Sequence, residues 1–226
     1  MTKETYDLIE NYMRSCMEDS AHDREHIYRV LYNALEIAEA ETAPDYDVLI
    51  TACLLHDIGR REQFENPVLC HAMVGGEKAY RFLMEHGFGS EFSRKVRHCI
   101  QTHRFRRNMQ LESLEAKILF DADKLDATGA LGIARTLMYK GNVAEPIYTR
   151  LSDGSISDGT QDDAPSFFYE YRFKLEKLYG EFYTVKGAQL AQERRKIAMA
   201  FYESLYREVS LSDTSGREIL RKWIGE

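Results

Sequence analysis

Proline and glycine are scarce in this sequence, with 4 Pro and 14 Gly among 226 residues. Collagen-like and low-complexity chains are rich in these residues, and β-sandwiches need them at many turns. Hydrophobic residues make up 44% of the chain, which is enough for a sizeable core. The composition therefore excludes fibrous and low-complexity proteins and argues against disorder and against a turn-rich β-sandwich.

Positive charge is also in short supply, because 30 Lys and Arg face 37 Asp and Glu, for a net charge of −7. A broad basic surface for nucleic acid is absent, so we expect no stable nucleic-acid complex. Residues 94–107 form a local exception with basic residues and no acid: Arg94, Lys95, Arg97, Arg104, Arg106 and Arg107. This zone is either a solvated helix face or a positive patch that steers an anionic ligand.

The four cysteines form no Cys-x-x-Cys pair, which argues against a thiolate zinc site and against a disulfide framework. No apolar run approaches the roughly 18 residues of a membrane span, so we expect no membrane association. The first residues, Met1 to Asp7, are polar and contain no apolar signal-peptide segment. These absences predict a cytoplasmic protein.

Apolar residues recur at helical spacing through most of the chain, and no convincing strand is visible. We expect helices over residues 3–18, 23–41, 46–57, 71–85, 90–102, 114–140, 166–180, 186–209 and 215–223. Asp45 is the expected N-cap of the third helix, Gly59 its stop, and Gly129 and Gly132 are expected to divide the long segment 114–140. The prediction is an all-α, single-domain helical bundle.

Within that bundle we expect residues 1–140 to form the core and residues 166–226 to be C-terminal helices packed on it. The helical pattern dissolves over residues 141–165, which predicts a long loop or a short hairpin and a candidate lid. The aromatic segment 167–173 then follows, and three interpretations stay open for it: core packing, a homodimer contact, or a wall on which a base stacks.

The sharpest chemical signal is the pair His56-Asp57, which ends an apolar helix. A carboxylate at a helix C-terminus faces the negative end of the helix dipole, and burying it without a partner costs several kcal/mol. A bound divalent cation removes both problems. His26 shares an apolar stripe with Val30 and Ile37, so it faces the interior and is the natural third ligand.

A second signal is the aspartate cluster Asp121, Asp123 and Asp126, which lies inside another apolar helix. Leu119, Asp123 and Asp126 share one face at i, i+4 and i+7 spacing, so an inward-facing carboxylate is expected there. Two histidines and two aspartates provide nitrogen and oxygen ligands without sulfur. Such a set suits manganese, iron, nickel, cobalt, zinc or magnesium, and the sequence does not choose among them.

These residues resemble the motifs of the HD-domain metal-dependent phosphohydrolase superfamily, in which His, His-Asp and Asp lie on successive helices. The matching segments are His22-Asp23-x-x-His26-x-x-Arg29-Val30, Leu55-His56-Asp57-Ile58-Gly59 and the run from Asp121 to Arg135. They are similar to a bacterial branch that includes nucleotide pyrophosphohydrolases, and the similarity extends over nearly the whole chain.

The resemblance implies that His26, His56, Asp57 and Asp123 hold a divalent metal, and that Asp57 also orients a water molecule or takes its proton. His71 and His103 resemble positions that hold a second metal in some relatives and that contact phosphate or protonate a leaving group in others. Lys124, Arg29, Arg60 and Arg104 would bind a substrate phosphate. Asp126 would hold a ligand histidine or Lys124 in place.

The resemblance further implies an enzyme that hydrolyses nucleoside triphosphates or related small nucleotides to a monophosphate and pyrophosphate. The nearest alternative is a nucleotidase or phosphodiesterase of the same superfamily. A di-iron oxygenase on the same scaffold would use His71 and His103 as ligands of a second iron. A catalytically silent nucleotide-binding regulator is the third alternative, although such a protein has no chemical need of all four ligands.

Overall fold

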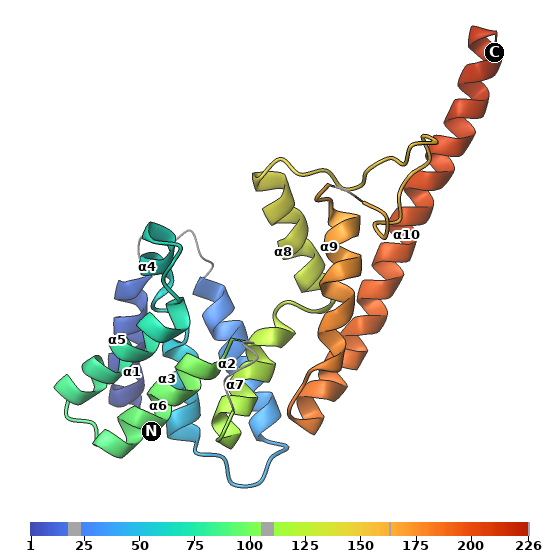
Figure 1. Ribbon diagram of the computed structural model, residues 1–226. Helices are drawn as coiled ribbons and strands as arrows, with labels where there is room; N and C mark the ends of the chain where they lie inside the picture. The colour runs from blue at the N-terminus through green and yellow to red at the C-terminus, as the bar shows by residue number, and fades with distance from the viewer. Residues whose placement is uncertain (18–23, 105–110, 163, 226) are drawn as a thin grey trace. The chain divides into compact units, whose positions relative to one another are not determined.

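The computed structural model describes residues 1–17, 24–104, 111–162 and 164–225, and the described part is built from helices (Figure 1). In these ranges no strand forms, and one isolated antiparallel bridge joins Arg150 and Ile156. The predicted all-α class is therefore confirmed. His22 and Asp23 of the first motif, and Arg106 and Arg107 of the basic zone, lie outside the described residues. None of the described helices is long and apolar enough to span a membrane.

Two compact units divide the chain: residues 1–126 with 182–187, and residues 127–181 with 188–226. The helices of the first unit are α1 (Lys3–Cys16), α2 (Arg24–Ala38), α3 (Tyr46–Leu55), α4 (Arg60–Glu65), α5 (His71–Glu85), α6 (Ser90–Thr102) and α7 (Leu114–Leu125). The second unit contains α8 (Gly129–Asn142), α9 (Phe167–Phe173), the 3-10 helix η1 (Leu175–Gly180) and, from residue 188 onward, α10 (Val185–Ile224).

Helix α3 lies at the centre of the first unit, because α1, α2, α5, α6 and α7 all pack against it. It begins at Asp45, whose carboxylate accepts a hydrogen bond from the Val48 amide, as the predicted N-cap should. The residues from Val48 to Leu55 are buried with one exception, Ile50. A helix that is apolar nearly all round is stable only inside a core, so its C-terminus delivers His56 and Asp57 to the middle of the unit.

The segment after α3 differs from the prediction. Helix α3 ends at Leu55, and Gly59 precedes a short helix, α4, that the hydrophobic pattern did not indicate. Gly59 packs against the start of α5 so closely that a Cβ atom on it would lie 2.6 Å from the amide nitrogen of Gly75. Close backbone approach, rather than helix termination, therefore explains this glycine.

The long helical segment 114–140 is divided as predicted, but only one of the two predicted glycines lies at the division. Helix α7 ends at Leu125 and α8 begins at Gly129, whose φ of +64° lies in the left-handed region that favours glycine. Gly132 lies inside α8.

Aromatic side chains form the core of the second unit. Phe167, Phe168 and Tyr171 of α9 are buried, and the Tyr171 ring stacks on Tyr202 of α10 with 4.2 Å between ring centroids. The Tyr202 hydroxyl donates to the carbonyl of Asp158, which ties the 141–165 segment to α10. Core packing is therefore the interpretation of the aromatic segment that these three buried side chains support.

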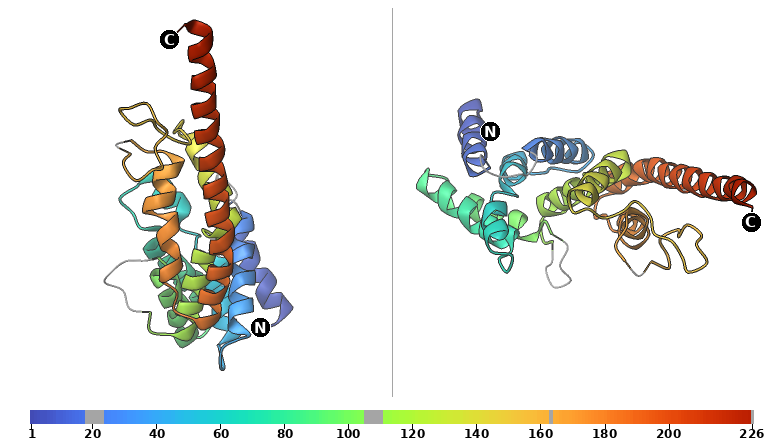
Figure 2. Two further views of the ribbon diagram at one scale, coloured as in Figure 1. Left: turned by 90° about the vertical axis from the view of Figure 1, so that its right-hand side faces the viewer. Right: turned by 90° about the horizontal axis from the view of Figure 1, so that it is seen from above.

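Helix α10 is continuous from Val185 to Ile224, where the sequence predicted two helices (Figure 2). The run of Ser, Asp, Thr and Gly over 210–216 resembles a loop, since these residues compete for backbone hydrogen bonds. Inside the helix they are accommodated, because the Thr214 hydroxyl donates to the Ser210 carbonyl and Asp213 pairs with Arg217 one turn later.

Candidate metal centre

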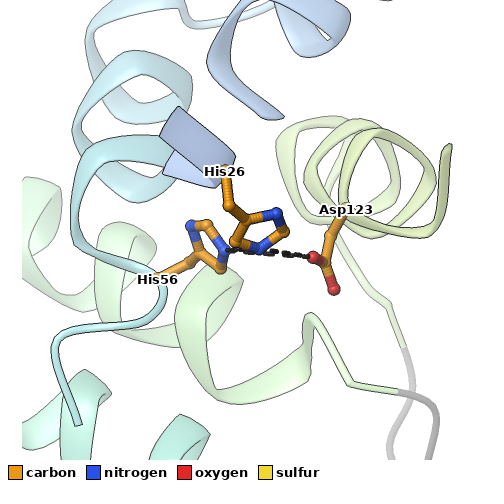
Figure 3. A group of neighbouring side chains, drawn as sticks. All are labelled: His26, His56 and Asp123. Carbon is orange, nitrogen blue, oxygen red and sulfur yellow. Dashed lines mark hydrogen bonds and ion pairs between the residues drawn. The ribbon is translucent and has the colours of Figure 1, made fainter. Parts of the chain in front are cut away.

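Three side chains from separate parts of the first unit meet in its interior, and we call them the first cluster: His26, His56 and Asp123 (Figure 3). His26 lies on α2, His56 follows α3, and Asp123 lies on α7. The Nε2 atom of His26 is 3.2 Å from Oδ1 of Asp123 and 3.3 Å from Nε2 of His56. All three ligand atoms lie within 4.8 Å of one another, so one cation can contact all of them.

A second cluster lies beside the first and consists of Asp57, His71 and His103. His71 is the first residue of α5 and His103 directly follows α6. The Nε2 atom of His71 is 3.3 Å from Oδ1 of Asp57 and 3.4 Å from Nε2 of His103. All three side chains are buried.

Asp57 connects the two clusters, because its two carboxylate oxygens face different histidines. Oδ2 lies 3.6 Å from Nε2 of His26 and 3.7 Å from Nε2 of His56, whereas Oδ1 faces His71 and His103. The structure thus brings together all four predicted metal ligands and adds His71 and His103 to the same centre.

In each of the four histidines of the centre, the Nδ1 atom lies within hydrogen-bond distance of an oxygen atom. The partners are the Cys53 carbonyl for His56 (2.8 Å), the Ile100 carbonyl for His103 (2.6 Å), Gln63 Oε1 for His71 (2.6 Å) and Asp126 Oδ2 for His26 (2.7 Å). With Nδ1–H engaged in this way, Nε2 is the atom left to coordinate. Four imidazole Nε2 atoms and two carboxylates that face one another form a set of ligands that fits a divalent cation.

Burial and charge hold most of these groups in the state that a metal ligand requires. Burial lowers the pKa of His56 to about 4 and that of His71 to about 3. Burial opposes ionisation of Asp57, but the neighbouring His56 and Arg60 hold the pKa of its carboxyl well below its usual range. His56 and His71 are therefore neutral and Asp57 is ionised at neutral pH.

His26 differs from the other histidines. Burial opposes its charge, but hydrogen bonds to Asp123 and Asp126 outweigh this and raise the pKa of His26 to about 9. The same contact with His26 lowers the pKa of Asp123 to about 2, against the effect of burial. A proton therefore occupies His26 in the metal-free protein at neutral pH, and a cation would have to displace it.

The predicted phosphate-binding residues lie near this centre, and Arg60, Arg29 and Lys124 already have partners in the structure. Arg60 Nε donates to Oδ1 of Asp57 at 2.9 Å, and Arg29 Nε donates to Oδ1 of Asp126 at 2.6 Å. The Lys124 ammonium lies over the rings of Phe120 and Phe182, and the charge of Arg104 contributes to the lowered pKa of His71. Their contact with a substrate stays a prediction.

Gln63 is the residue that sequence reasoning missed. It lies on α4, where the sequence offered no helical pattern, and it contacts His71 eight residues later. No motif signals this contact, because it depends on how α4 and the turn before α5 fold back. The buried Asp121 is also accounted for: it accepts hydrogen bonds from the backbone amides of Tyr183 and Thr184 and so lies outside both clusters.

Comparison with known proteins agrees with the site. The HD domain family matches residues 24–128. The Bacillus subtilis protein YpgQ, described as uncharacterized, is 30% identical over 207 residues, which cover 89% of this chain and 92% of YpgQ. The crystal structure of YpgQ in complex with ADP has a TM-score of 0.69 at 30% identity and covers 90% of this chain and 97% of that chain.

Two further crystal structures are similar. An HD-superfamily hydrolase from Bacillus thuringiensis has a TM-score of 0.71 at 30% identity and covers 91% of this chain and 97% of that one. A predicted HD superfamily hydrolase from an uncultured Thermotogales bacterium has a TM-score of 0.60 at 30% identity, with 88% and 90% covered. Together with the His and Asp residues gathered in its first unit, this similarity shows that the chain belongs to the HD domain family.

Proposed function

We propose that this protein is a metal-dependent phosphohydrolase that cleaves nucleoside triphosphates or related small nucleotides into a monophosphate and pyrophosphate. The observation that carries this proposal is the pair of clusters connected by Asp57, in which four Nε2 atoms and two carboxylates face one another. The hydrolases among its relatives support a hydrolytic reaction, and the relative crystallised in complex with ADP supports a nucleotide ligand.

The first cluster and Asp57 would hold a divalent cation whose identity the donor set leaves open. When bound, such an ion supplies Lewis acidity, which makes a water a better nucleophile and a phosphoryl group a better electrophile at neutral pH. Asp57, ionised at neutral pH, would orient the attacking water or accept its proton. Water attack at the α-phosphorus then breaks the bond to the bridging oxygen, which leaves with pyrophosphate.

His71 and His103 have two proposed roles. With Asp57 they form a group whose ligand atoms lie close enough to contact one cation, and we propose that this cluster takes a second metal or contacts the substrate phosphate directly. In the second case, His103 would give a proton to the leaving oxygen, a step in which a positioned acid contributes a rate factor of roughly 10² to 10⁴. His71, whose pKa burial lowers to about 3, would contact the phosphate without donating a proton from Nε2.

The cationic side chains around the centre would bind the phosphates. Arg60 holds Asp57 from one side, Lys124 follows the cluster residue Asp123, and Arg104 follows His103. Because the chain is acidic overall, these local charges would attract a polyphosphate to the centre. Arg29 completes the proposed set, one helical turn after His26 on α2.

The test is an activity assay with defined products. The metal-stripped protein is incubated with a panel of nucleoside triphosphates and with added manganese, magnesium, cobalt or nickel, and the products are separated by chromatography. We expect the products to be a monophosphate and pyrophosphate, and we expect them only when metal is added. Diphosphate and phosphate as products would contradict attack at the α-phosphorus, and turnover of monophosphates or cyclic nucleotides alone would favour a nucleotidase or phosphodiesterase.

The second cluster also favours one alternative from another reaction class, a di-iron oxygenase. That function requires Asp57, His71 and His103 to hold a second iron, and the structure places these three together. The purified protein would then contain two iron atoms per chain and absorb visible light. One exchangeable metal per chain, with hydrolytic turnover, would refute it.

A further inference from the structure

The two clusters are built alike in one respect: each contains one histidine held by a backbone carbonyl and one held by a side chain. His56 and His103 donate to the carbonyls of Cys53 and Ile100. No substitution removes these two partners. The side-chain partners, by contrast, are a carboxylate in the first cluster and a neutral amide in the second, and both can be changed by mutation.

In the second cluster, the orientation of the Gln63 amide fixes the ligand atom of His71. The Nε2 group of Gln63 donates to the carbonyl of Leu69 at 3.0 Å, an oxygen that can only accept. Oε1 must therefore face His71, where it lies 2.6 Å from Nδ1 and accepts its proton. This leaves the Nε2 lone pair of His71 directed at Asp57 and His103.

In the first cluster, Asp126 plays the corresponding part for His26. Asp126 is fully buried on the turn that ends α7, and its Oδ2 lies 2.7 Å from Nδ1 of His26. Arg29, one helical turn beyond His26, donates to both oxygens of Asp126 at 2.6 and 3.2 Å. The carboxylate is thus held in place, and its negative charge makes the His26 imidazole a stronger ligand than a neutral partner would.

The charges around the two clusters also favour stronger metal binding at the first cluster. The first cluster contains the carboxylate of Asp123 and is backed by that of Asp126. The second has only the shared Asp57, whose Oδ1 already accepts from the Arg60 guanidinium at 2.9 Å. Arg29 offsets the charge of Asp126 as Arg60 offsets that of Asp57, so the carboxylate of Asp123 is the remaining difference between the two clusters. A divalent cation is therefore attracted more strongly to the first cluster than to the second.

We propose that Asp126 and Gln63 are positioning residues that give the two clusters unequal metal affinity: Asp126 makes the first cluster the tight site, and Gln63 sets up the second as a weaker, exchangeable site. This inference rests on the proposed metal-dependent function and adds the order in which the sites fill. The Leu69 carbonyl belongs to the turn before α5, so the weaker site depends on the conformation of that turn.

The experiment is a binding titration that requires no turnover. The full-length, metal-stripped protein is titrated with Mn²⁺, and the free ion is measured by electron paramagnetic resonance. The wild-type protein should show two classes of site. Gln63→Ala should weaken only the weaker class by about 10- to 100-fold, and Asp126→Asn should weaken only the tighter class by about the same factor, as expected for residues that hold a metal-ligating histidine.

Matched variants separate positioning from loss of structure. Gln63→Glu keeps an acceptor for His71 but loses the donor to the Leu69 carbonyl, so it should weaken the weaker class less than Gln63→Ala does. Gln192→Ala removes a glutamine that also donates to a backbone carbonyl, that of Tyr179, and should change neither class. Asp121→Asn removes a different buried α7 carboxylate and should also leave both classes unchanged.

A single class of site in the wild-type protein would overturn the inference, as would equal weakening of both classes by either variant, or no change with Gln63→Ala. If Asp126→Asn does not fold, Asp126→Glu provides the test, with the tighter class again the one expected to change. A protein that gives the expected titration but hydrolyses no nucleotide would refute the proposed reaction alone, whereas nucleotide turnover with one class of site would refute only this inference.

Discussion

The two clusters of the centre are connected by Asp57, and each contains one histidine held by a backbone carbonyl and one held by a side chain. They differ in the charge around them. Two carboxylates, Asp123 and Asp126, lie in or behind the first cluster, and Arg29 pairs with one of them. The second cluster has the carboxylate of Asp57, which pairs with Arg60. Ligand geometry alone therefore does not determine which of two neighbouring sites has the higher metal affinity. We expect the groups that hold the ligands, and the charges behind them, to decide which site a cation fills first.

The largest effect is expected from Asp57→Ala, because this change removes the carboxylate that both clusters use. Metal binding at both sites and nucleotide turnover should be abolished, while the helical content measured by circular dichroism should not change. Asp153→Ala, in an exposed turn of the second unit, is the control that should retain both properties. Full activity of Asp57→Ala would end the argument for a metal-dependent hydrolase.

The next effect separates the two clusters. Asp123→Ala removes the only carboxylate that belongs to the first cluster alone, so the tight Mn²⁺ site and turnover should both be lost. His103→Ala removes a ligand of the second cluster only, so one tight Mn²⁺ should still bind while kcat falls by roughly 10² or more. Loss of the tight site in His103→Ala would show that the clusters do not act separately.

A smaller, graded effect is expected from pH. A metal entering the first cluster displaces a proton from His26, whose pKa is raised to about 9 by Asp123 and Asp126 against the effect of burial. The apparent affinity of the tight site should therefore fall about tenfold for each pH unit below about 9. Mn²⁺ titrations between pH 6.5 and pH 9.5 measure this slope, and an affinity independent of pH would contradict it.

The raised pKa of His26 also affects the stability of the metal-free chain, which should decrease as the pH rises. Because the pKa of His26 is raised on folding, its contribution to stability is fully present below pH 6.5 and is lost as the pH rises through about 9. Thermal unfolding of the metal-free protein should show a fall in Tm over this range. The fall should be smaller when Mn²⁺ is bound, since His26 is then a ligand at every pH in the range.

The smallest effect is expected at Lys124, which belongs to neither cluster. Its ammonium lies 5.3 Å from the ring centroid of Phe182 and is proposed to bind a substrate phosphate. Lys124→Ala should raise KM for a nucleoside triphosphate by about tenfold, the loss of one charge-assisted hydrogen bond, and leave Mn²⁺ affinity unchanged. Lys117→Ala, on the same helix, is the matched control. Equal effects of the two variants on KM would contradict the assignment.

Much of the fold could be predicted because its helices are strongly amphipathic or fully apolar. The bounds of α5 and α6 agree with the prediction, and Asp45 caps α3 as expected. Helix α4 was missed because its six residues bury no apolar side chain and so leave no periodic signal. The continuous α10 was missed because its Ser- and Asp-containing segment is typical of a loop unless an i, i+4 ion pair supports it.

The metal centre, too, has parts that could be predicted from the sequence and parts that could not. His26, His56, Asp57 and Asp123 could be predicted, since each is a polar residue on an apolar helix face or at the end of an apolar helix. The split into two clusters could not, because it depends on which way the two oxygens of Asp57 point. Gln63 could not be predicted either, since its contact with His71 arises only from the path of the turn between α4 and α5.

The most direct test of unequal metal sites is an anomalous-difference map from crystals of the full-length protein soaked in a low concentration of Mn²⁺. A strong peak among His26, His56, Asp57 and Asp123, with a weaker peak or none between Asp57, His71 and His103, is the predicted result. A dominant peak at the second cluster, equal peaks at both, or no peak at either would contradict it.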